Sequence, residues 1–360
     1  MKKTLIAFAA LSAIAGVAQA QSSVTLYGLV DAFVGRTTSQ VGAAAKLSQT
    51  VVNGSGQNNS RWGLRGSEDL GGGMKAIFTL EGGFQPDNGT NATISAQGGG
   101  LFGRAAFVGI EGGFGTVTLG RVYSAYDDLR GATNMIYDSN FATTGTVYGT
   151  GLRDYQNRSS NAIRYVSPTV SGFSGAISYG MGENKTATAS AEKVTALHIK
   201  YVNGPLFVGY AYQNEKQVNG GSYFGTNATL GTAATALTFD SNRKYHALGA
   251  SYDFGVAKLT GSYNTSKGET AANTSASDKG YQLGVSVPFG AAAVAVGYSR
   301  EKSDATNNNN RGKGMSILGT YALSKRTNLY AGYLSTKVQS TNGTSETKAT
   351  TLGTGIKHTF

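Results

Sequence analysis

The sequence predicts an all-β protein: a single closed antiparallel barrel of sixteen strands that spans a membrane. Three observations predict this fold. The chain begins with a basic and then apolar segment typical of export, it ends in a strand with one apolar face, and many similar segments separated by turns lie between. Glycine accounts for 52 of the 360 residues, about twice the usual share, as turn-rich β-structure favours.

Residues 1–20 have the three parts of a secretory signal peptide. Two lysines make the start basic, residues 4–16 are apolar but too short to cross a bilayer, and residues 18–20 form a small-residue cleavage site. A membrane anchor is the alternative, but no stop-transfer flank follows the apolar part. We expect cleavage to leave residues 21–360 as one barrel domain.

The last strand alternates in character and ends at the C-terminus. Leu352, Ile356 and Phe360 share one face, whereas Lys357 and Thr359 share the other, because successive residues of a strand point to opposite sides. A strand that is apolar on one side and polar on the other, with no tail after it, is typical of a barrel in a bacterial outer membrane.

Composition excludes several other classes of protein. The chain has no cysteine, so an exported disulfide framework is excluded. The part after the signal peptide has no run of 18 apolar residues, so a helical membrane protein is excluded as well. The formal charge of +11 is scattered along the chain instead of concentrated in one segment, and we expect no nucleic-acid partner.

The alternating segments number sixteen, an even count that places both chain ends on one side of the barrel. Short turns separate them on that side, and long connections rich in Asn, Thr, Ser, Gly and Ala separate them on the other, which we expect to be extracellular. The predicted strands are 24–36, 60–70, 73–84, 101–112, 115–124, 160–169, 173–182, 193–203, 205–215, 243–254, 256–267, 279–289, 291–302, 312–323, 327–337 and 348–360. The predicted long connections are 37–59, 85–100, 125–159, 183–192, 216–242, 268–278, 303–311 and 338–347.

Charged residues of the strands fall on the face opposite to apolar ones. Arg61 and Arg65 share a face, and Trp62 and Leu64 share the other. A charge facing lipid near the bilayer centre costs about 2–4 kcal/mol for Arg or Lys, so the alternation places these charges in the lumen. The same pattern directs further basic residues inward: Arg164, His198 and Lys200. Sixteen strands leave room for an aqueous channel.

The first strand has an unusually small outward face. Its members include Gly28 and Ala32 between Val24 and Val34. A flat face of this kind allows close backbone approach, which favours contact with another subunit. Ordinary lipid-facing surface is the alternative.

Four segments and the chain end resemble one family. They are Gln21–Gly28, Ser60–Gly73, Gly113–Arg121 and Asn161–Pro168, together with Phe360. They are similar to the corresponding segments of the general diffusion porins of β-proteobacteria, and the resemblance extends over the whole chain after the signal peptide. It implies passive diffusion of small hydrophilic solutes and inorganic ions across the outer membrane of a Gram-negative cell.

The resemblance also implies partners and an assembly signal. It implies a homotrimer in which each barrel has its own pore and each contacts outer-membrane lipid and lipopolysaccharide. The aromatic Phe360 on the outward face is similar to the signal that the outer-membrane insertion machinery reads.

The resemblance further implies a third loop that folds inward and narrows the pore. Here this is the longest connection, 125–159, which carries three acidic candidates: Asp127, Asp128 and Asp138. Opposite them the family has basic wall residues. The matching positions are Arg61 on the second predicted strand, Arg104 on the fourth and Arg153 near the sixth; the further candidates are Arg65, Arg158 and Arg164.

Opposed charges across a narrow aqueous gap orient polar solutes, and excess positive charge favours anions. We therefore expect a modest anion preference. We also expect the double substitution of Arg61 and Arg104 to leave folding intact, because lumen water would solvate both. Alternatively, each arginine is only a solvated lumen or rim charge, and Asp127 and Asp128 brace the base of the loop.

Other functions remain open at this stage. A substrate-specific channel is the nearest alternative, followed by a barrel that acts mainly as an adhesin or receptor. The three histidines lie on separate strands and the sequence has no hydrolase motif, so an enzyme is disfavoured, and no cofactor or metal is expected.

Overall fold

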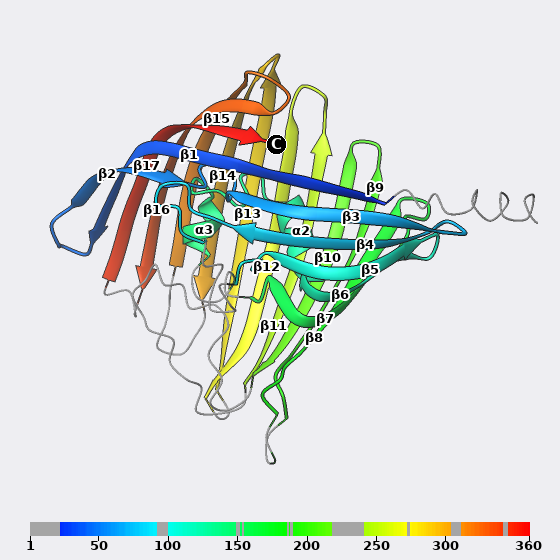
Figure 1. Cartoon of the computed structure of the whole chain (residues 1–360). Coiled ribbons are helices and arrows are strands. Elements are labelled where there is room, and N and C mark those ends of the chain that lie inside the picture. Colours follow the sequence, from blue (N-terminus) through cyan, green and yellow to red (C-terminus); the bar gives the residue numbers. More distant parts are fainter. Residues whose placement is uncertain are drawn as a thin grey trace, which may run out of the picture.

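A computed structural model of the chain describes a single closed β-barrel with two short helices inside it (Figure 1). It describes residues 22–91, 100–148, 152, 155–185, 187, 190–217, 241–271, 274–303, 311–340 and 345–360. The predicted signal peptide, residues 1–20, lies outside these ranges, as does Arg153. None of the helices in the described ranges is long and apolar enough to cross a membrane.

The strands pair with their sequence neighbours in antiparallel register, and β1 pairs with β17 to close the sheet. The strands are β1 (Ser23–Val41), β2 (Leu47–Gly54), β3 (Arg61–Gly71), β4 (Met74–Gly83), β5 (Ala105–Gly112), β6 (Gly115–Tyr123), β7 (Arg158–Val166), β8 (Phe173–Met181), β9 (Lys193–Asn203), β10 (Leu206–Gln217), β11 (Ser241–Asp253), β12 (Lys258–Ala271), β13 (Thr274–Phe289), β14 (Ala292–Ser303), β15 (Arg311–Ala322), β16 (Thr327–Ser340) and β17 (Ser345–Thr359).

The seventeen strands of the described residues occupy sixteen positions in the wall, because β2 and β3 both pair with β1, along different parts of its length. The predicted number of wall strands is therefore confirmed. The prediction that 37–59 is a loop was wrong for most of its length, since β1 continues to Val41 and β2 returns along it. These residues extend beyond the apolar band, where water reaches both faces, so their sequence lacks the alternation that marks a lipid-facing strand.

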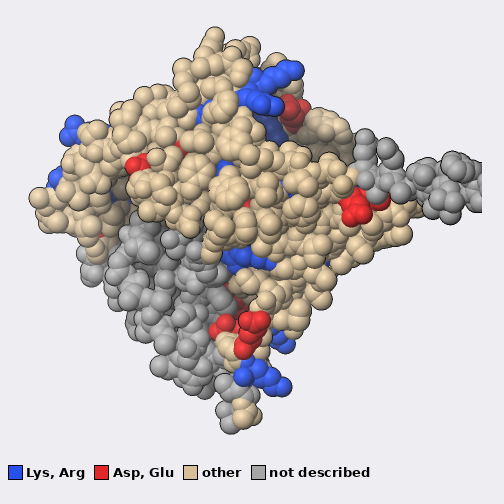
Figure 2. All heavy atoms as spheres, in the orientation of Figure 1, with Lys and Arg blue, Asp and Glu red and all other residues tan. Residues whose placement is uncertain are grey.

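The outward face of the barrel is apolar and the inward face is polar, as the alternation predicted. On β15, Met315 and Ile317 are exposed on the outside while the alternating residues Gly314 and Ser316 are buried. Figure 2 shows the face over β1, β3, β4 and β5 as mostly uncharged, with its acidic and basic side chains mainly near the edges. Such a surface is suited to lipid or to another apolar wall.

Phe360 extends the closure between the first and last strands. Its backbone exchanges two hydrogen bonds with Gly28, at 3.0 and 3.1 Å. A β-carbon at position 28 would lie 2.6 Å from the Phe360 ring, so glycine is required for the ring to lie over β1. The Phe360 side chain remains 40% exposed on the outward face, where the sequence placed it.

The connection between β6 and β7 folds into the barrel and carries helices α2 (Ala125–Ala132) and α3 (Thr143–Val147). α2 contacts the inner wall at β8 to β11, and α3 contacts it at β14 to β16. The side chain of Ser124 caps α2 by accepting a hydrogen bond from the Asp127 amide, at 3.2 Å. The inward course implied for the third loop is thus present in the structure.

A track of inward-facing glycines makes room for this loop. A β-carbon at Gly332 on β16 would lie 2.7 Å from the Phe141 ring, and one at Gly280 on β13 would lie 2.6 Å from Leu152. β-carbons at three further wall glycines would likewise come too close to side chains of the loop. They are Gly209 against Leu129, Gly249 against Thr133 and Gly284 against Met135. Because side chains at these positions would push the loop toward the pore axis, the track fixes how closely it follows the β10–β16 wall.

Candidate pore constriction

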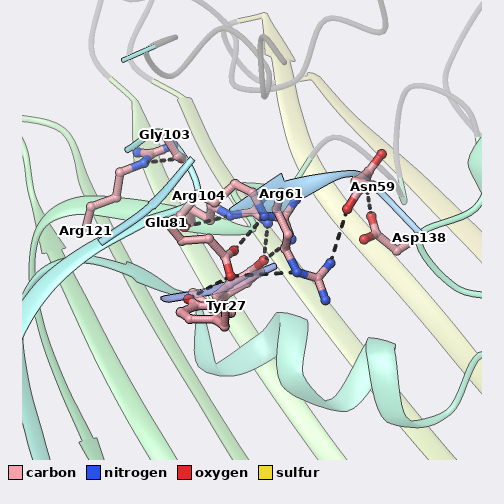
Figure 3. Close-up of polar contacts among 10 residues, drawn as sticks. Tyr27, Asn59, Arg61, Glu81, Gly103, Arg104, Arg121 and Asp138 are labelled. Atoms are coloured by element: carbon pink, nitrogen blue, oxygen red, sulfur yellow. Dashed lines mark hydrogen bonds and ion pairs between the residues drawn. The ribbon is translucent and has the colours of Figure 1, made fainter. Parts of the chain in front are cut away.

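Two arginines meet around one carboxylate on the wall opposite the loop (Figure 3). The Arg104 Nε donates to Glu81 Oε1 at 2.6 Å, and the Arg61 Nε lies 3.7 Å from Glu81 Oε2. The Tyr27 hydroxyl also donates to Oε2, at 3.0 Å. Glu81 is therefore held from three sides, and it orients both guanidinium groups in the lumen.

A second group extends this basic wall toward β7. Arg158 stacks on Tyr123, with its guanidinium carbon 4.1 Å from the ring centre, and its Nε donates to the Arg104 carbonyl at 3.0 Å. Arg104 in turn donates to the Tyr123 hydroxyl at 2.9 Å. Arg61, Arg104 and Arg158 are thus joined through Glu81 and Tyr123 into one cluster, the arginine wall.

Arg104 differs from the sequence prediction in two respects. It does not lie on a strand, because β5 begins at Ala105 and not at residue 101. Lumen water does not solvate it either: Arg104 is only 3% exposed, whereas the Arg61 side chain is 28% exposed. The reason is that Glu81, Tyr123 and Arg158 pack around its guanidinium.

Among the loop acids, Asp138 is the one that faces the arginine wall. It has a positive φ of 58° and accepts a hydrogen bond from Asn59, next to Arg61 (Figure 3). Burial raises its pKa, while the positive charges of Arg104, Arg158 and Arg61 act in the opposite direction. Asp138 therefore lies within electrostatic reach of all three arginines.

Asp127 and Asp128 hold the base of the loop in place. Asp127 accepts hydrogen bonds from the hydroxyls of Tyr137 and Tyr155. Asp128 forms an ion pair with Arg164 and lies 3.5 Å from His198 Nδ1. This geometry agrees with the bracing role that was the alternative for these two aspartates.

Arg65 and Arg164 lie apart from the arginine wall. Arg65 is four residues along β3 from Arg61, about 13 Å toward the short-turn end, and its guanidinium covers the Tyr27 ring. Arg164 is engaged with Asp128 at the base of the loop. The structure therefore brings together Arg61, Arg104 and Arg158 from the predicted set, with Asp138 opposite.

Sequence reasoning missed several residues of this site. Glu81 lies in register with Gly63, between Arg61 and Arg65 on the inward face of β3, so strand pairing could have found it. Lys357 on β17 donates to Asn58 at 2.9 Å and adds another lumen cation. Arg130 of α2 is buried against the rings of Tyr148 and Tyr155, and nothing in the sequence pattern indicates that contact.

Asp31 on β1 fixes the segment that connects β2 to β3. The Asp31 carboxylate is inaccessible to solvent and accepts hydrogen bonds from three successive backbone amides: Gly56 at 3.0 Å, Gln57 at 2.7 Å and Asn58 at 2.7 Å. The Tyr330 hydroxyl on β16 donates to the same carboxylate at 2.5 Å. These bonds fix residues 55–60, which we call the anchor segment.

The anchor segment holds the third loop next to Asp138. The Asn140 amide donates to the Ser55 carbonyl at 2.8 Å, and its side-chain amide donates to the Gly54 carbonyl at 2.7 Å. Ser139 donates to the Gly56 carbonyl. A polar cavity of about 220 Å³ lies along this contact, lined in part by Asn59 and Asp138. The position of Asp138 against the arginine wall thus depends on Asp31.

A family model described as Gram-negative porin matches residues 7–341 of the chain. This chain belongs to the Gram-negative porin family. The recognition made from the sequence segments is confirmed.

Relatives and solved structures of this porin agree with the assignment. An outer membrane porin of Bordetella pertussis is 36% identical over 284 residues, covering 73% of this chain and 69% of the relative. Outer membrane porin protein 32 of Delftia acidovorans is 38% identical over 270 residues, covering 72% and 68%. The structure of an anion-selective porin from Comamonas acidovorans aligns with a TM-score of 0.75 at 30% identity, covering 94% of this chain and 100% of that one.

The family defines the basic function and location of the porin. It is a channel in the outer membrane of a Gram-negative cell, and small hydrophilic solutes cross it by passive diffusion. The loop that narrows the lumen and the arginine wall opposite it form the candidate constriction of that channel.

Glu81→Gln should raise the preference of the porin for anions. The substitution keeps the side-chain shape and an acceptor for Tyr27, but it removes the negative charge between Arg61 and Arg104. Across a salt gradient, the reversal potential should move closer to that of a channel that passes only anions. The single-channel conductance should change little. Glu68→Gln, on the outward face of the same hairpin, is a charge-matched control. An unchanged reversal potential would show that Glu81 does not contribute to the field in the pore.

Proposed function

We propose that this porin passes small anions in modest preference to cations. The observation that carries the proposal is the arginine wall: Arg61 and Arg104 flank a single carboxylate, Glu81, and Arg158 lies against Arg104. Lys357 adds a positive charge beside them. The similar Comamonas structure is named an anion-selective porin, which supports the same direction of preference.

The loop acids offset this charge only in part. Asp127 is hydrogen-bonded by two tyrosines and Asp128 is paired with Arg164, so their charges act at the base of the loop. Asp138 alone among the three faces the arginine wall. Fixed charges beyond a Debye length of about 8 Å are largely screened at physiological salt, so the groups at the narrowest point determine selectivity.

The test is the reversal potential of the wild-type channel in a planar bilayer across a potassium chloride gradient. The sign of the reversal potential should correspond to anion preference. Its magnitude should decrease when both salt concentrations are raised, because screening increases. A zero or cation-type potential at low salt would contradict the proposal.

The proposal includes a homotrimer with its subunit contact at β1. The outward face of β1 combines small residues with exposed apolar ones, including Gly28, Ala32, Val24 and Val34. Light scattering in a non-denaturing detergent should show three chains per particle, and the particle should dissociate on heating. A monomeric mass before heating would contradict this assembly.

Phe360 is proposed as the signal for membrane insertion. Its ring is exposed on the outward face while its backbone pairs with Gly28, so the ring can be changed without loss of the pairing. Phe360→Ala should lower the amount of folded porin in the outer membrane at native expression, whereas Phe360→Tyr should not. Equal levels for both variants and wild type would remove this role from the ring.

We also propose that residues 1–20 are a cleaved signal peptide and that the long-connection end of the barrel is extracellular. Contact with outer-membrane lipid and lipopolysaccharide then follows from the exposed apolar residues of the outward face. Mass spectrometry of the mature porin should find Gln21 as its first residue.

A further inference from the structure

The cavity between the third loop and the anchor segment carries both signs of charge. It measures about 220 Å³, and both Arg130 of α2 and Asp138 line it. Hydroxyl and amide groups make up much of the remaining lining, among them those of Asn59, Thr144 and Asn157. A polar cavity that presents one cation and one anion is suited to a solute that itself carries both charges.

Arg130 contributes a buried cation to this cavity. It is 6% exposed, its Nη1 donates to the Leu152 carbonyl at 3.0 Å, and its guanidinium lies over the rings of Tyr148 and Tyr155. A guanidinium has five N–H donors, so most of them remain after the bond to Leu152. No carboxylate within the described part of the chain forms an ion pair with Arg130. Because an isolated buried charge is costly, this geometry favours a carboxylate supplied from outside the chain.

Asp138 contributes an acceptor with unused capacity. Its Oδ1 accepts the hydrogen bond from Asn59 (Figure 3), and its Oδ2 has no donor among the described residues. The arginine wall acts on Asp138 electrostatically, but none of the three arginines forms an ion pair with it. An ammonium group is a donor that would complete this carboxylate.

The neighbouring hydroxyl groups add both a donor and acceptors. The side-chain amide of Asn134 donates to the Thr144 hydroxyl at 2.6 Å, so Thr144 can use its own hydrogen for a solute. Tyr137 and Tyr155 both donate to Asp127, so their oxygens can accept from a solute. The cavity can therefore satisfy the remaining donors and acceptors of a small solute that has a charge at each end.

Solutes with a single charge fit this lining less well. A simple anion would meet Arg130 but also the carboxylate of Asp138, and a simple cation would meet the same two groups with the signs reversed. Water can fill a polar cavity, but it supplies no counter-charge to Arg130.

We propose that the cavity binds a small zwitterion of the α-amino-acid class, with its carboxylate on Arg130 and its ammonium on Asp138. A volume of about 220 Å³ lies below the range of about 300–1,000 Å³ that is typical of pockets for drug-sized ligands, so the site selects small amino acids. This site differs from the arginine wall, because its cation belongs to the third loop. The inference goes beyond the proposed anion preference and does not depend on it.

The test measures glycine binding to the full mature porin refolded in a nonionic detergent. Saturation-transfer NMR of the glycine methylene protons gives the affinity. Acetate and methylammonium, which each carry one of the two charges of glycine, serve as competitors. Competition confines the measurement to the glycine site, so acetate bound at the arginine wall is not counted. Wild type should prefer glycine to either competitor by about 10-fold or more, because a hydrogen bond to a charged group contributes about 10- to 100-fold in affinity.

Two substitutions should change the preference in opposite directions. Asp138→Asn keeps the side-chain shape, an oxygen for Asn59 and a residue type that tolerates the positive φ. It should weaken glycine binding about 10-fold and make acetate the better competitor. Arg130→Gln should weaken glycine binding by a similar factor and make methylammonium the better competitor. Glu68→Gln, which removes the same charge as Asp138→Asn on the outward face, should bind glycine like wild type.

Three results with wild type alone would overturn the proposal, so the test does not depend on the folding of a variant. Acetate that competes as well as glycine would show a plain anion site, and methylammonium that does so would show a plain cation site. Absence of saturable glycine binding would show a cavity that holds only water. Heat-dependent gel migration confirms that each variant is folded, and glycine binding unchanged in both folded variants would also contradict the assignment.

Discussion

Substituting alanine for Arg61 and Arg104 together should shift the reversal potential toward cations. In the wild type, these two arginines and Glu81 carry a summed charge of +1; the double variant leaves −1 at the same place. Within the described part of the chain, the Tyr27 hydroxyl would then be the remaining hydrogen-bond donor to the Glu81 carboxylate. This reversal of sign is the largest change of charge that two alanine substitutions among these three residues can make.

The double variant should also be less stable than wild type, contrary to the expectation from sequence. Breaking a buried ion pair from one side costs about 3–5 kcal/mol, and Arg104 is buried against Glu81. Arg61→Ala alone should cost little, because its side chain is partly exposed. Midpoints of heat-dependent gel migration for the single and double variants measure this difference.

A triple variant that adds Glu81→Gln separates the two effects. It removes the uncompensated carboxylate, so stability should recover in part and selectivity should approach neutrality. Arg65→Ala, on the same strand but nearer the short-turn end, is the matched control and should change the reversal potential less. If the double variant keeps wild-type selectivity, these arginines do not determine the field in the pore.

The wall strands were predictable because lipid and water impose the alternation directly. Each lipid-facing segment, such as β15 with Met315 and Ile317 outward, must alternate to avoid charge in the bilayer. β2 was not predicted as a strand because water reaches both of its faces. Its sequence therefore does not alternate between apolar and polar residues.

The arginine wall was predictable in part. The position of Arg61 follows from alternation, and that of Arg104 came from the family resemblance. The role of Glu81 needed the pairing of β3 with β4, which places it in the same cluster. The anchor segment could not be predicted, because Asp31 binds backbone amides of Gly56, Gln57 and Asn58, and amides have no signature in the sequence.

Asp31→Ala should widen the constriction by releasing the third loop. The substitution takes away the acceptor of three backbone amides and of the Tyr330 hydroxyl, and each buried polar group left unsatisfied costs about 1–3 kcal/mol. The anchor segment should then lose its fixed shape. Its bonds to Asn140 and Ser139 depend on that shape, so Asp138 should move away from the arginine wall.

The expected results are higher single-channel conductance, greater current noise and weaker ion selectivity. The barrel itself should remain, because the ladders of β1 with β17 and with β3 do not involve the Asp31 side chain. Tyr330→Phe is the matched control: it removes one hydrogen bond to the carboxylate and keeps the three amides in place, so its effect should be much smaller.

Asp31→Asn distinguishes anchoring from simple loss of charge. Asparagine has the same shape, but its amide nitrogen is a donor and would face backbone N–H groups that also donate, so part of the anchor is lost. Its conductance should lie between those of wild type and Asp31→Ala. If charge beside Lys357 were what mattered, Asp31→Asn and Asp31→Ala would shift selectivity equally and leave conductance unchanged. That outcome would show that the loop is held at the arginine wall by its own packing on the glycine track and not by the anchor segment.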